Sequence, residues 1–200
     1  NSHQVRFDVD LIRRYDRSGP RYTSYPTAVQ FTDRFGLAEY RAAALASNQD
    51  PIPRPLSLYV HIPFCSSPCF YCGCTKVITR DHEKAEAYLY RLHREIELQS
   101  QLYDRDREVE QLHFGGGTPT FLTSLEIDRL IEKLGSHFKL SSDPGREYSI
   151  ELDPRTITSD TLRDLAHVGF NRCSLGIQDF DPLVQEAVNR IQSVPDTLDR

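Results

Sequence analysis

The sequence has little that would mark a membrane, secreted or nucleic-acid-binding protein. None of its apolar runs approaches the roughly 20 residues that a membrane-spanning helix needs, and no signal-peptide pattern opens the chain. Lys and Arg residues are scattered among Asp and Glu, with a net charge of −5, so no basic stretch stands out. We therefore expect a cytoplasmic protein with no membrane span and no nucleic acid as its main partner.

Methionine is absent, even from the first position, and the last residues follow a segment that is predicted to begin a further helix. We expect that the natural protein continues beyond residue 200. The chain is 38% hydrophobic and 26% charged, which is typical of one globular domain with a sizeable core. It contains no internal repeat and no low-complexity segment.

Cysteine is scarce, but its positions are informative. Four of the five cysteines fall between residues 65 and 74, and an odd total with this clustering is atypical of a disulfide framework. Cys65, Cys69 and Cys72 are spaced so that one loop can wrap around an iron–sulfur cubane, whose usual ligands are thiolates. Three thiolates on four irons leave one iron open to a chelating substrate. The alternatives are a compact zinc site completed by Cys74 or His61, a disulfide and a thioredoxin-like redox pair.

The two remaining cysteines are predicted to have other roles. Cys74 is separated from Cys72 by a single residue, which is too tight for an easy fourth ligand of the same cluster. Cys173 lies within a predicted strand, where we expect a small, buried, hydrophobic side chain.

Residues 1–54 are predicted to form an N-terminal extension. Two short helices flank a loop that is rich in Pro and Tyr, and their expected ranges are Val9–Tyr15 and Gly36–Ala46. Pro51, Pro53 and Pro55 mark the end of the extension, because closely spaced prolines disfavour the interior of both helices and strands.

Residues 55–200 alternate four times between strand and helix patterns. The predicted strands are Leu56–Ile62, Val109–Phe114, Tyr148–Leu152 and Arg172–Ile177. The helices that follow them are Asp81–Tyr103, one behind a Thr123–Glu126 capping box, one capped by Ser159 and one opened by Pro182. This alternation predicts an α/β fold with a parallel sheet and right-handed crossovers, amounting to about the first four units of a (β/α) barrel.

The unusual residues of the chain follow the carboxyl ends of these strands. The cysteine loop follows the first strand, Gly115-Gly116-Gly117 the second, and Gln178 the fourth, while Glu151 closes the third. Because chemistry in (β/α) barrels gathers at the carboxyl ends of the strands, we expect these segments to form one site.

The motifs resemble those of a known family. Cys-x-x-x-Cys-x-x-Cys with Tyr71 before its last cysteine is the signature of radical S-adenosylmethionine (SAM) enzymes. Within them the chain resembles the oxygen-independent coproporphyrinogen III oxidases of haem biosynthesis. The matching segments, which cover nearly the whole chain, are residues 20–27 (Pro-Arg-Tyr-Thr-Ser-Tyr-Pro-Thr), 55–65, 72–74 (Cys-Gly-Cys), 112–120, 149–155, 169–180 and 188–190.

The resemblance implies a radical SAM barrel in which Cys65, Cys69 and Cys72 hold a [4Fe–4S] cluster and SAM chelates its open iron. It implies that a 5′-deoxyadenosyl radical starts the oxidative decarboxylation of two propionates of coproporphyrinogen III to vinyl groups, giving protoporphyrinogen IX. It also implies an electron donor, which we leave unidentified, and a second SAM molecule; we expect a monomer. By motif match, the residues around the first SAM are Tyr59, Gly116 and Glu151, and those around the second are Tyr71, Gly117, Thr118, Gln178 and Arg190.

The main alternative is a haem-binding chaperone related to these oxidases. Such relatives share the three cysteines and the glycine triplet but typically lack the Tyr-Thr-Ser-Tyr-Pro segment and the Cys-Gly-Cys ending. Both features are present here, so we favour the oxidase. Enzymes of the family are more than twice as long and carry a further C-terminal domain, so we expect residues 55–200 to be the N-terminal part of the barrel.

Overall fold

The structure is a computed structural model that describes residues 7–17 and 27–198. The chain divides into two compact units, residues 1–40 and 41–200. Most of the predicted Pro- and Tyr-rich loop, including Tyr22 and Tyr25, lies outside the described residues.

The first unit contains short helices. The α1 helix (Val9–Tyr15) has the predicted range, and it begins after Asp8, whose carboxylate accepts hydrogen bonds from the first-turn amides of Asp10 and Leu11 at 3.0 and 2.9 Å. A 3-10 turn, η1 (Ala28–Gln30), follows. The α2 helix (Leu37–Ala46) begins in this unit and ends in the second, within one residue of the predicted range.

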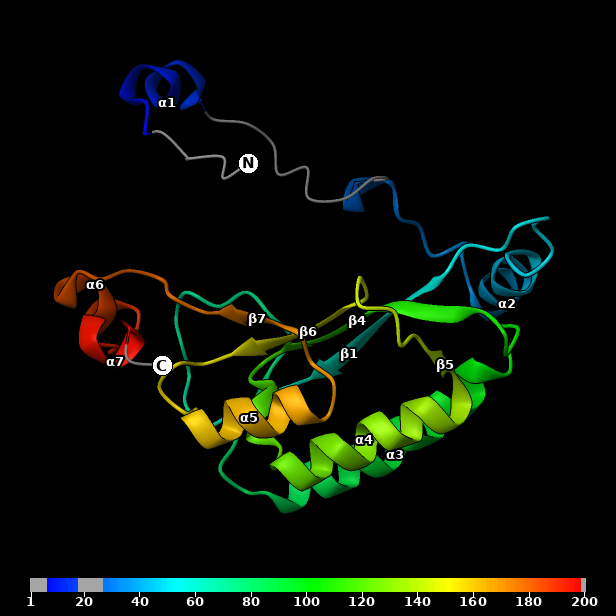
Figure 1. Ribbon diagram of the computed structural model, residues 1–200. Helices are drawn as coiled ribbons and strands as arrows, with labels where there is room; N and C mark the ends of the chain where they lie inside the picture. Colours follow the sequence, from blue (N-terminus) through cyan, green and yellow to red (C-terminus); the bar gives the residue numbers. More distant parts are fainter. Residues whose placement is uncertain (1–6, 18–26, 199–200) are drawn as a thin grey trace. The chain divides into compact units, whose positions relative to one another are not determined.

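The second unit is built on a parallel sheet (Figure 1). Its strands are ordered β1-β4-β6-β7, with the short β5 paired to the start of β4. The bounds are β1 (Leu56–Ile62), β4 (Glu108–Gly116), β5 (Lys139–Leu140), β6 (Glu147–Leu152) and β7 (Arg172–Leu175). The four predicted strands and their parallel arrangement are therefore confirmed.

The three long crossover helices cover one face of the sheet, as Figure 1 shows. They are α3 (Glu83–Ser100), α4 (Ser124–His137) and α5 (Ser159–His167). Shorter elements complete the unit: η2 (Pro119–Phe121), α6 (Pro182–Ala187) and α7 (Val194–Leu198). Among the described residues, no helix has the length and apolar character to cross a membrane.

Local sequence signals explain where two of these helices begin. The capping box at α4 is confirmed, because Thr123 and Glu126 each accept a hydrogen bond from the other's backbone amide. The prediction for α5 is wrong by one residue: Thr158, not Ser159, is the cap. Thr158 has its capping-box partner, Thr161, three residues further on.

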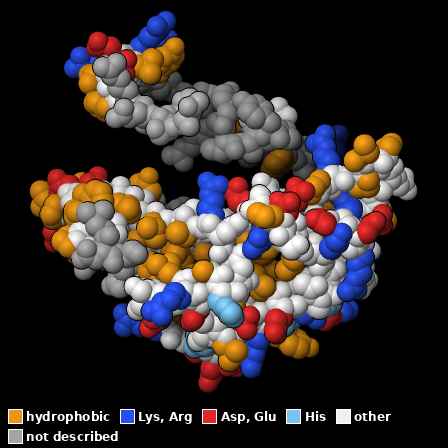
Figure 2. Space-filling view, viewed as in Figure 1, with side chains coloured by type: hydrophobic (Ala, Val, Ile, Leu, Met, Phe, Trp, Pro, Cys, Tyr) orange, Lys and Arg blue, Asp and Glu red, His pale blue; other side chains and the backbone are white. Residues whose placement is uncertain are grey.

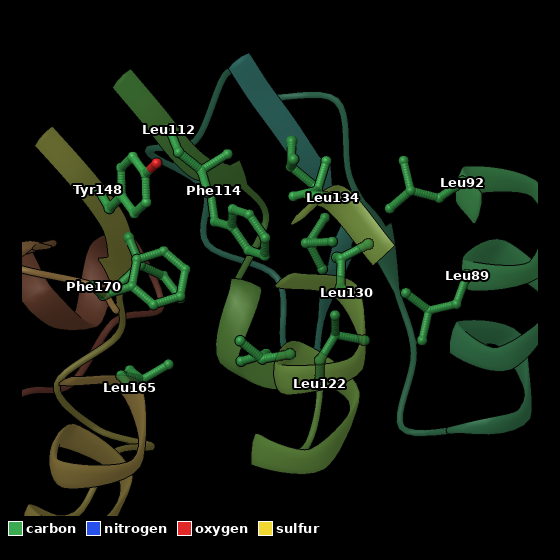
Figure 3. Close-up of a cluster of buried hydrophobic side chains, with 14 of the residues drawn as sticks. Leu89, Leu92, Leu112, Phe114, Leu122, Leu130, Leu134, Tyr148, Leu165 and Phe170 are labelled. Atoms are coloured by element: carbon green, nitrogen blue, oxygen red, sulfur yellow. The ribbon is translucent and has the colours of Figure 1, made fainter. Parts of the chain in front are cut away.

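The hydrophobic core lies between the sheet and the three helices (Figure 3). Side chains of alternate strand residues, such as Leu112 and Phe114 of β4, point to this face and are fully buried. They meet Leu130 and Leu134 of α4. Burying each such side chain stabilises the fold by about 1.5–3 kcal/mol, so this layer holds the strands in place beneath the site.

The opposite face of the sheet carries polar side chains. Because successive strand residues point to opposite faces, Tyr59 and His61 of β1, His113 of β4, and Ser149 and Glu151 of β6 share this face. On the surface shown in Figure 2, acidic and basic side chains are interspersed.

The expectation for Cys173 is wrong. Its side chain is exposed, as are all four residues of β7. The reason is its place in the sheet: β7 ends the strand order and pairs only with β6 among the described residues.

Candidate functional site

A cavity of about 790 Å³ opens at the carboxyl ends of β1, β4, β6 and β7. This volume lies in the range of small-molecule sites, about 300–1,000 Å³. The cavity is lined by ten of the eleven predicted site residues: Cys65, Cys69, Tyr71, Cys72, Gly116, Gly117, Thr118, Glu151, Gln178 and Arg190. Tyr59 is not among the lining residues.

The cysteine loop is closed at its base by a small parallel pair of strands. The β2 strand (Phe64–Cys65) pairs with β3 (Val77–Ile78). The amide of Val77 donates to the Pro63 carbonyl at 2.7 Å, and the amide of Thr79 donates to the Cys65 carbonyl at 2.9 Å. Both ends of the loop that carries the cysteines are thus fixed to the end of β1.

A second contact supports the middle of this loop. The side chain of Asn189 donates to the Pro68 carbonyl at 2.7 Å, and the amide of Phe70 donates to the Val188 carbonyl at 2.9 Å. Asn189 has a φ of 54°, a left-handed conformation that Asn tolerates better than most residues. Sequence reasoning assigned no role to Asn189, whose partner is 121 residues away.

All five cysteines are free thiols. Burial raises the pKa of the Cys65 thiol, although the hydroxyl of Thr118, 3.7 Å from its sulfur, acts in the opposite direction. The amide of Cys74 lies 3.4 Å from the Cys72 sulfur. In residues 7–17 and 27–198, no three His, Cys, Asp or Glu side chains converge on a single metal ion. A cubane does not require such convergence, because each thiolate binds a different iron.

The glycine triplet allows close approach of the backbone to β1 and to the cysteine loop. Gly117 donates to the Ile62 carbonyl at 2.8 Å, and a Cβ on Gly117 would lie 2.7 Å from the Phe64 carbonyl oxygen. Gly116 has a φ of +116°, and a Cβ there would lie 2.7 Å from the His61 ring. Both positions therefore exclude a side chain.

Glu151 is anchored at both carboxylate oxygens. Oε2 accepts a hydrogen bond from the amide of Gly116 at 3.1 Å, and Oε1 lies 3.3 Å from His113 Nε2. Tyr59 stacks on the other side of His113, with ring centroids 5.7 Å apart, and its hydroxyl is 3.1 Å from His61 Nδ1. Burial raises the pKa of Tyr59, and the charges of Glu151 and Cys74 add to the effect. Tyr59 thus contacts His113, which in turn contacts Glu151 of the cavity lining.

Asp153 joins two arginines in the cavity wall. Its carboxylate accepts from Arg155 Nε and Nη2 at 2.9 and 2.6 Å and from Arg190 Nη2 at 3.4 Å. Burial alone would raise the pKa of Asp153, but the hydrogen bond from Arg155 and the charge of Arg190 outweigh it and lower that pKa. Sequence reasoning gave Asp153 and Arg155 no site role. The available signal was their position two and four residues after Glu151, at the same strand end.

Two polar atoms in the lining residues remain without a hydrogen-bond partner. They are Arg190 Nε and Thr120 Oγ1, both buried. Because buried polar groups are normally satisfied, these atoms fit a site that is completed by a polar ligand. Because four thiols also line the cavity, the lining suits a cluster and a charged small molecule.

Residues 59–200 match the model of the radical SAM superfamily. The chain belongs to this superfamily, and membership implies a [4Fe–4S] cluster and SAM as cofactors. The curated relatives show which members of the superfamily the chain is similar to. One from Pseudomonas aeruginosa, named oxygen-independent coproporphyrinogen III oxidase, is 53% identical over 193 residues, which are 96% of this chain and 42% of the relative.

Two other comparisons also find oxygen-independent or radical SAM coproporphyrinogen III oxidases. A relative of the same name from Mannheimia haemolytica is 46% identical over 76% of this chain and 99% of its own length. The solved structure of coproporphyrinogen III oxidase (HemN) from Escherichia coli, described as a radical SAM enzyme, superposes with a TM-score of 0.80 and 45% identity, covering 96% of this chain and 41% of that one. The chain thus spans about two fifths of the length of the first relative and of the solved structure.

Proposed function

We propose that this chain forms the cluster- and SAM-binding part of an enzyme that decarboxylates coproporphyrinogen III without oxygen. The observation that carries the proposal is the meeting of Cys65, Cys69 and Cys72 with Glu151 and Arg190 in one cavity at the strand ends. The names of the relatives support the substrate and favour an oxidase over a haem-binding chaperone. The cytoplasmic location, the monomeric state and the external electron donor stay predictions from the sequence.

In this proposal Cys65, Cys69 and Cys72 each bind one iron of a [4Fe–4S] cluster. When bound, the cluster and SAM would supply a 5′-deoxyadenosyl radical that takes a hydrogen atom from a propionate, after which loss of CO₂ and transfer of one electron to a one-electron acceptor would leave a vinyl group. The protein's part is placement and the exclusion of water and oxygen.

The remaining lining residues would hold two SAM molecules. Gly116 and Glu151, together with Tyr59, which is stacked on His113 outside the cavity lining, would contact the first. The second would contact five other lining residues: Tyr71, Gly117, Thr118, Gln178 and Arg190. The guanidinium of Arg190, held by Asp153 and the Gly176 carbonyl at 2.7 Å, is suited to a carboxylate.

The test is anaerobic reconstitution of the protein with iron and sulfide, followed by incubation with SAM, coproporphyrinogen III and a reductant. We expect 5′-deoxyadenosine and CO₂ to form together. If 5′-deoxyadenosine forms but the substrate loses no CO₂, the protein is a radical SAM enzyme with another substrate. If reconstituted protein contains zinc without iron or sulfide, the cluster is ruled out.

Single cysteine substitutions test the ligands. We expect Cys65→Ala, Cys69→Ala or Cys72→Ala to lower bound iron to background, because a cubane held by two thiolates is poorly retained. Cys74→Ala is the matched control, since Cys74 lies in the same loop and lines the same cavity. Loss of iron from Cys74→Ala at the same level would contradict the assignment.

A further inference from the structure

A row of side chains crosses the polar face of the sheet next to the cavity. Tyr59 of β1 pairs in register with His113 of β4, and His113 pairs with Ser149 of β6. The register places the imidazole between an aromatic ring and a hydroxyl. His113 is not a lining residue of the cavity, whereas Glu151, two residues after Ser149, is.

The hydrogen bonds of His113 are satisfied by a single tautomer. Nδ1 lies 2.7 Å from Ser149 Oγ, and Nε2 lies 3.3 Å from Glu151 Oε1. A carboxylate has no proton to donate, so Nε2 must carry the hydrogen. In the neutral ring Nδ1 then accepts the hydroxyl proton of Ser149. Stacking on Tyr59 at 5.7 Å and 19° fixes the plane of the ring.

This arrangement leaves the Glu151 carboxylate little freedom to rotate. His113 takes one oxygen, and the amide of Gly116 takes the other. Gly115 provides the space for the pair, because a Cβ there would lie 3.0 Å from His113 Nε2 and 3.1 Å from the Glu151 carboxyl carbon. The Glu151 side chain is 44% exposed and faces the cavity, so the partners of its carboxylate set its direction.

We propose that His113 is a positioning residue: through Nε2 it holds the carboxylate of Glu151 in the orientation that binds SAM, and the hydroxyl of Ser149, bonded to Nδ1, holds the imidazole in place for this contact. The inference rests on the proposed function, because it assigns Glu151 to SAM. It adds two polar residues, outside the cavity lining, on which the affinity for SAM depends.

The experiment measures equilibrium SAM binding to the cluster-loaded protein by anaerobic calorimetry without reductant, so that no turnover occurs. His113→Phe keeps a ring against Tyr59 but removes both hydrogen bonds. We expect it to raise the dissociation constant for SAM about fivefold to tenfold, since one hydrogen bond contributes about 1 kcal/mol. His113→Gln, whose amide nitrogen can occupy the position of Nε2, should bind within about twofold of the wild type.

Two further variants separate positioning from a general structural role. Ser149→Ala removes the hydroxyl that is bonded to Nδ1 of His113 and helps to hold the ring, and we expect SAM binding to weaken about twofold to threefold. His137→Phe is the control, because the partners of His137 in the described part of the chain are Ser136 and Lys133 of its own helix turn, and it should leave binding unchanged. Iron content and thermal unfolding are recorded for every variant.

The outcomes are distinct. If His113→Phe retains iron and binds SAM as tightly as the wild type, the inference is overturned. If His113→Phe does not fold, Ser149→Ala decides: weakened SAM binding supports the inference, and unchanged binding overturns it. Failure of the proposed function shows earlier, as a cluster-loaded wild type that does not bind SAM at all.

Discussion

Replacing Gly117 by Ala tests how closely the glycine triplet must approach the cysteine loop. The added Cβ would lie 2.7 Å from the Phe64 carbonyl oxygen and 2.8 Å from the carbonyl group of Pro63, whereas ordinary contacts begin at 3.4 Å. Neither side can retreat easily, because Gly117 and Thr118 donate to the Ile62 and Phe64 carbonyls, both at 2.8 Å. Overpacking usually lowers the free energy of unfolding by about 1–3 kcal/mol. Because the added Cβ meets backbone atoms that are held in place, we expect a loss in the upper half of this range, about 2–3 kcal/mol.

The assay is thermal unfolding of the apo-protein, so that ligand binding does not contribute to the result. For a chain of this length about 1 kcal/mol corresponds to about 2–4 °C, which gives a fall in Tm of about 4–12 °C. Gly73→Ala is the matched control, since Gly73 lines the same cavity but a Cβ there meets nothing within 4 Å. We expect Gly73→Ala to unfold no earlier than the wild type. Equal Tm values for the two variants would refute the reasoning.

Two predictions concern charged groups. Asp153→Asn leaves the guanidinium of Arg190, only 11% exposed, opposite a neutral amide, and should lower the free energy of unfolding by about 3 kcal/mol in urea titration. Hydrogen bonds from Lys133 and Arg94 lower the pKa of Glu97 from 4.5 to about 2. A carboxyl whose pKa is lowered by folding stabilises the fold when the pH is above the pKa of that carboxyl in the unfolded chain. Glu97→Gln should therefore be less stable than the wild type at pH 7. That difference should shrink as the pH falls from 4.5 towards 2.

Each prediction has a control on the same kind of residue. Asp160→Asn removes an exposed ion pair with Arg163, and we expect a change within about 0.5 kcal/mol; a loss as large as that of Asp153→Asn would show that burial is not the cause. Glu95→Gln changes an exposed carboxylate on the same helix as Glu97, one that has no ion pair among the described residues. A pH dependence of Glu95→Gln equal to that of Glu97→Gln would contradict the role of the Lys133 contact.

The sequence predicted what depends on local pattern. The range of β1 is identical to the prediction, because Leu56 to Ile62 alternates apolar and polar residues between clear boundaries. The capping box of α4 was equally readable, since its two members are three residues apart. The sequence could not decide between Thr158 and Ser159 as the cap of α5, because either side chain can cap a helix. The exposure of Cys173 depends on strand order rather than on its own segment.

Many of the residues that line the cavity could be predicted from the sequence, but the partners that orient them could not. Strand-end positions and the family motifs located ten of the residues that line the cavity. The partners that orient them are contacts between distant segments: Arg190 meets Asp153 across 37 residues, and Asn189 meets Pro68 across 121. Such pairs depend on how the segment after α6 meets the cysteine loop and the end of β6, which no local pattern reveals. His113 and Ser149 did carry a signal, because each is a polar residue between two hydrophobic neighbours of its strand.

The closed base of the cysteine loop affects how a cluster that oxygen has destroyed could be rebuilt. Its ends are held by the β2–β3 pair and by the hydrogen bonds from Val77 and Thr79, so the entropy cost of closing the loop is met by the fold before any iron binds. In a zinc finger, by contrast, the metal supplies the folding free energy, and its removal unfolds the chain. Here the loss of a cluster would leave the cysteine loop still attached to the fold at both of its ends. Repair would then need only fresh iron, sulfide and reduced thiols, without a new round of folding.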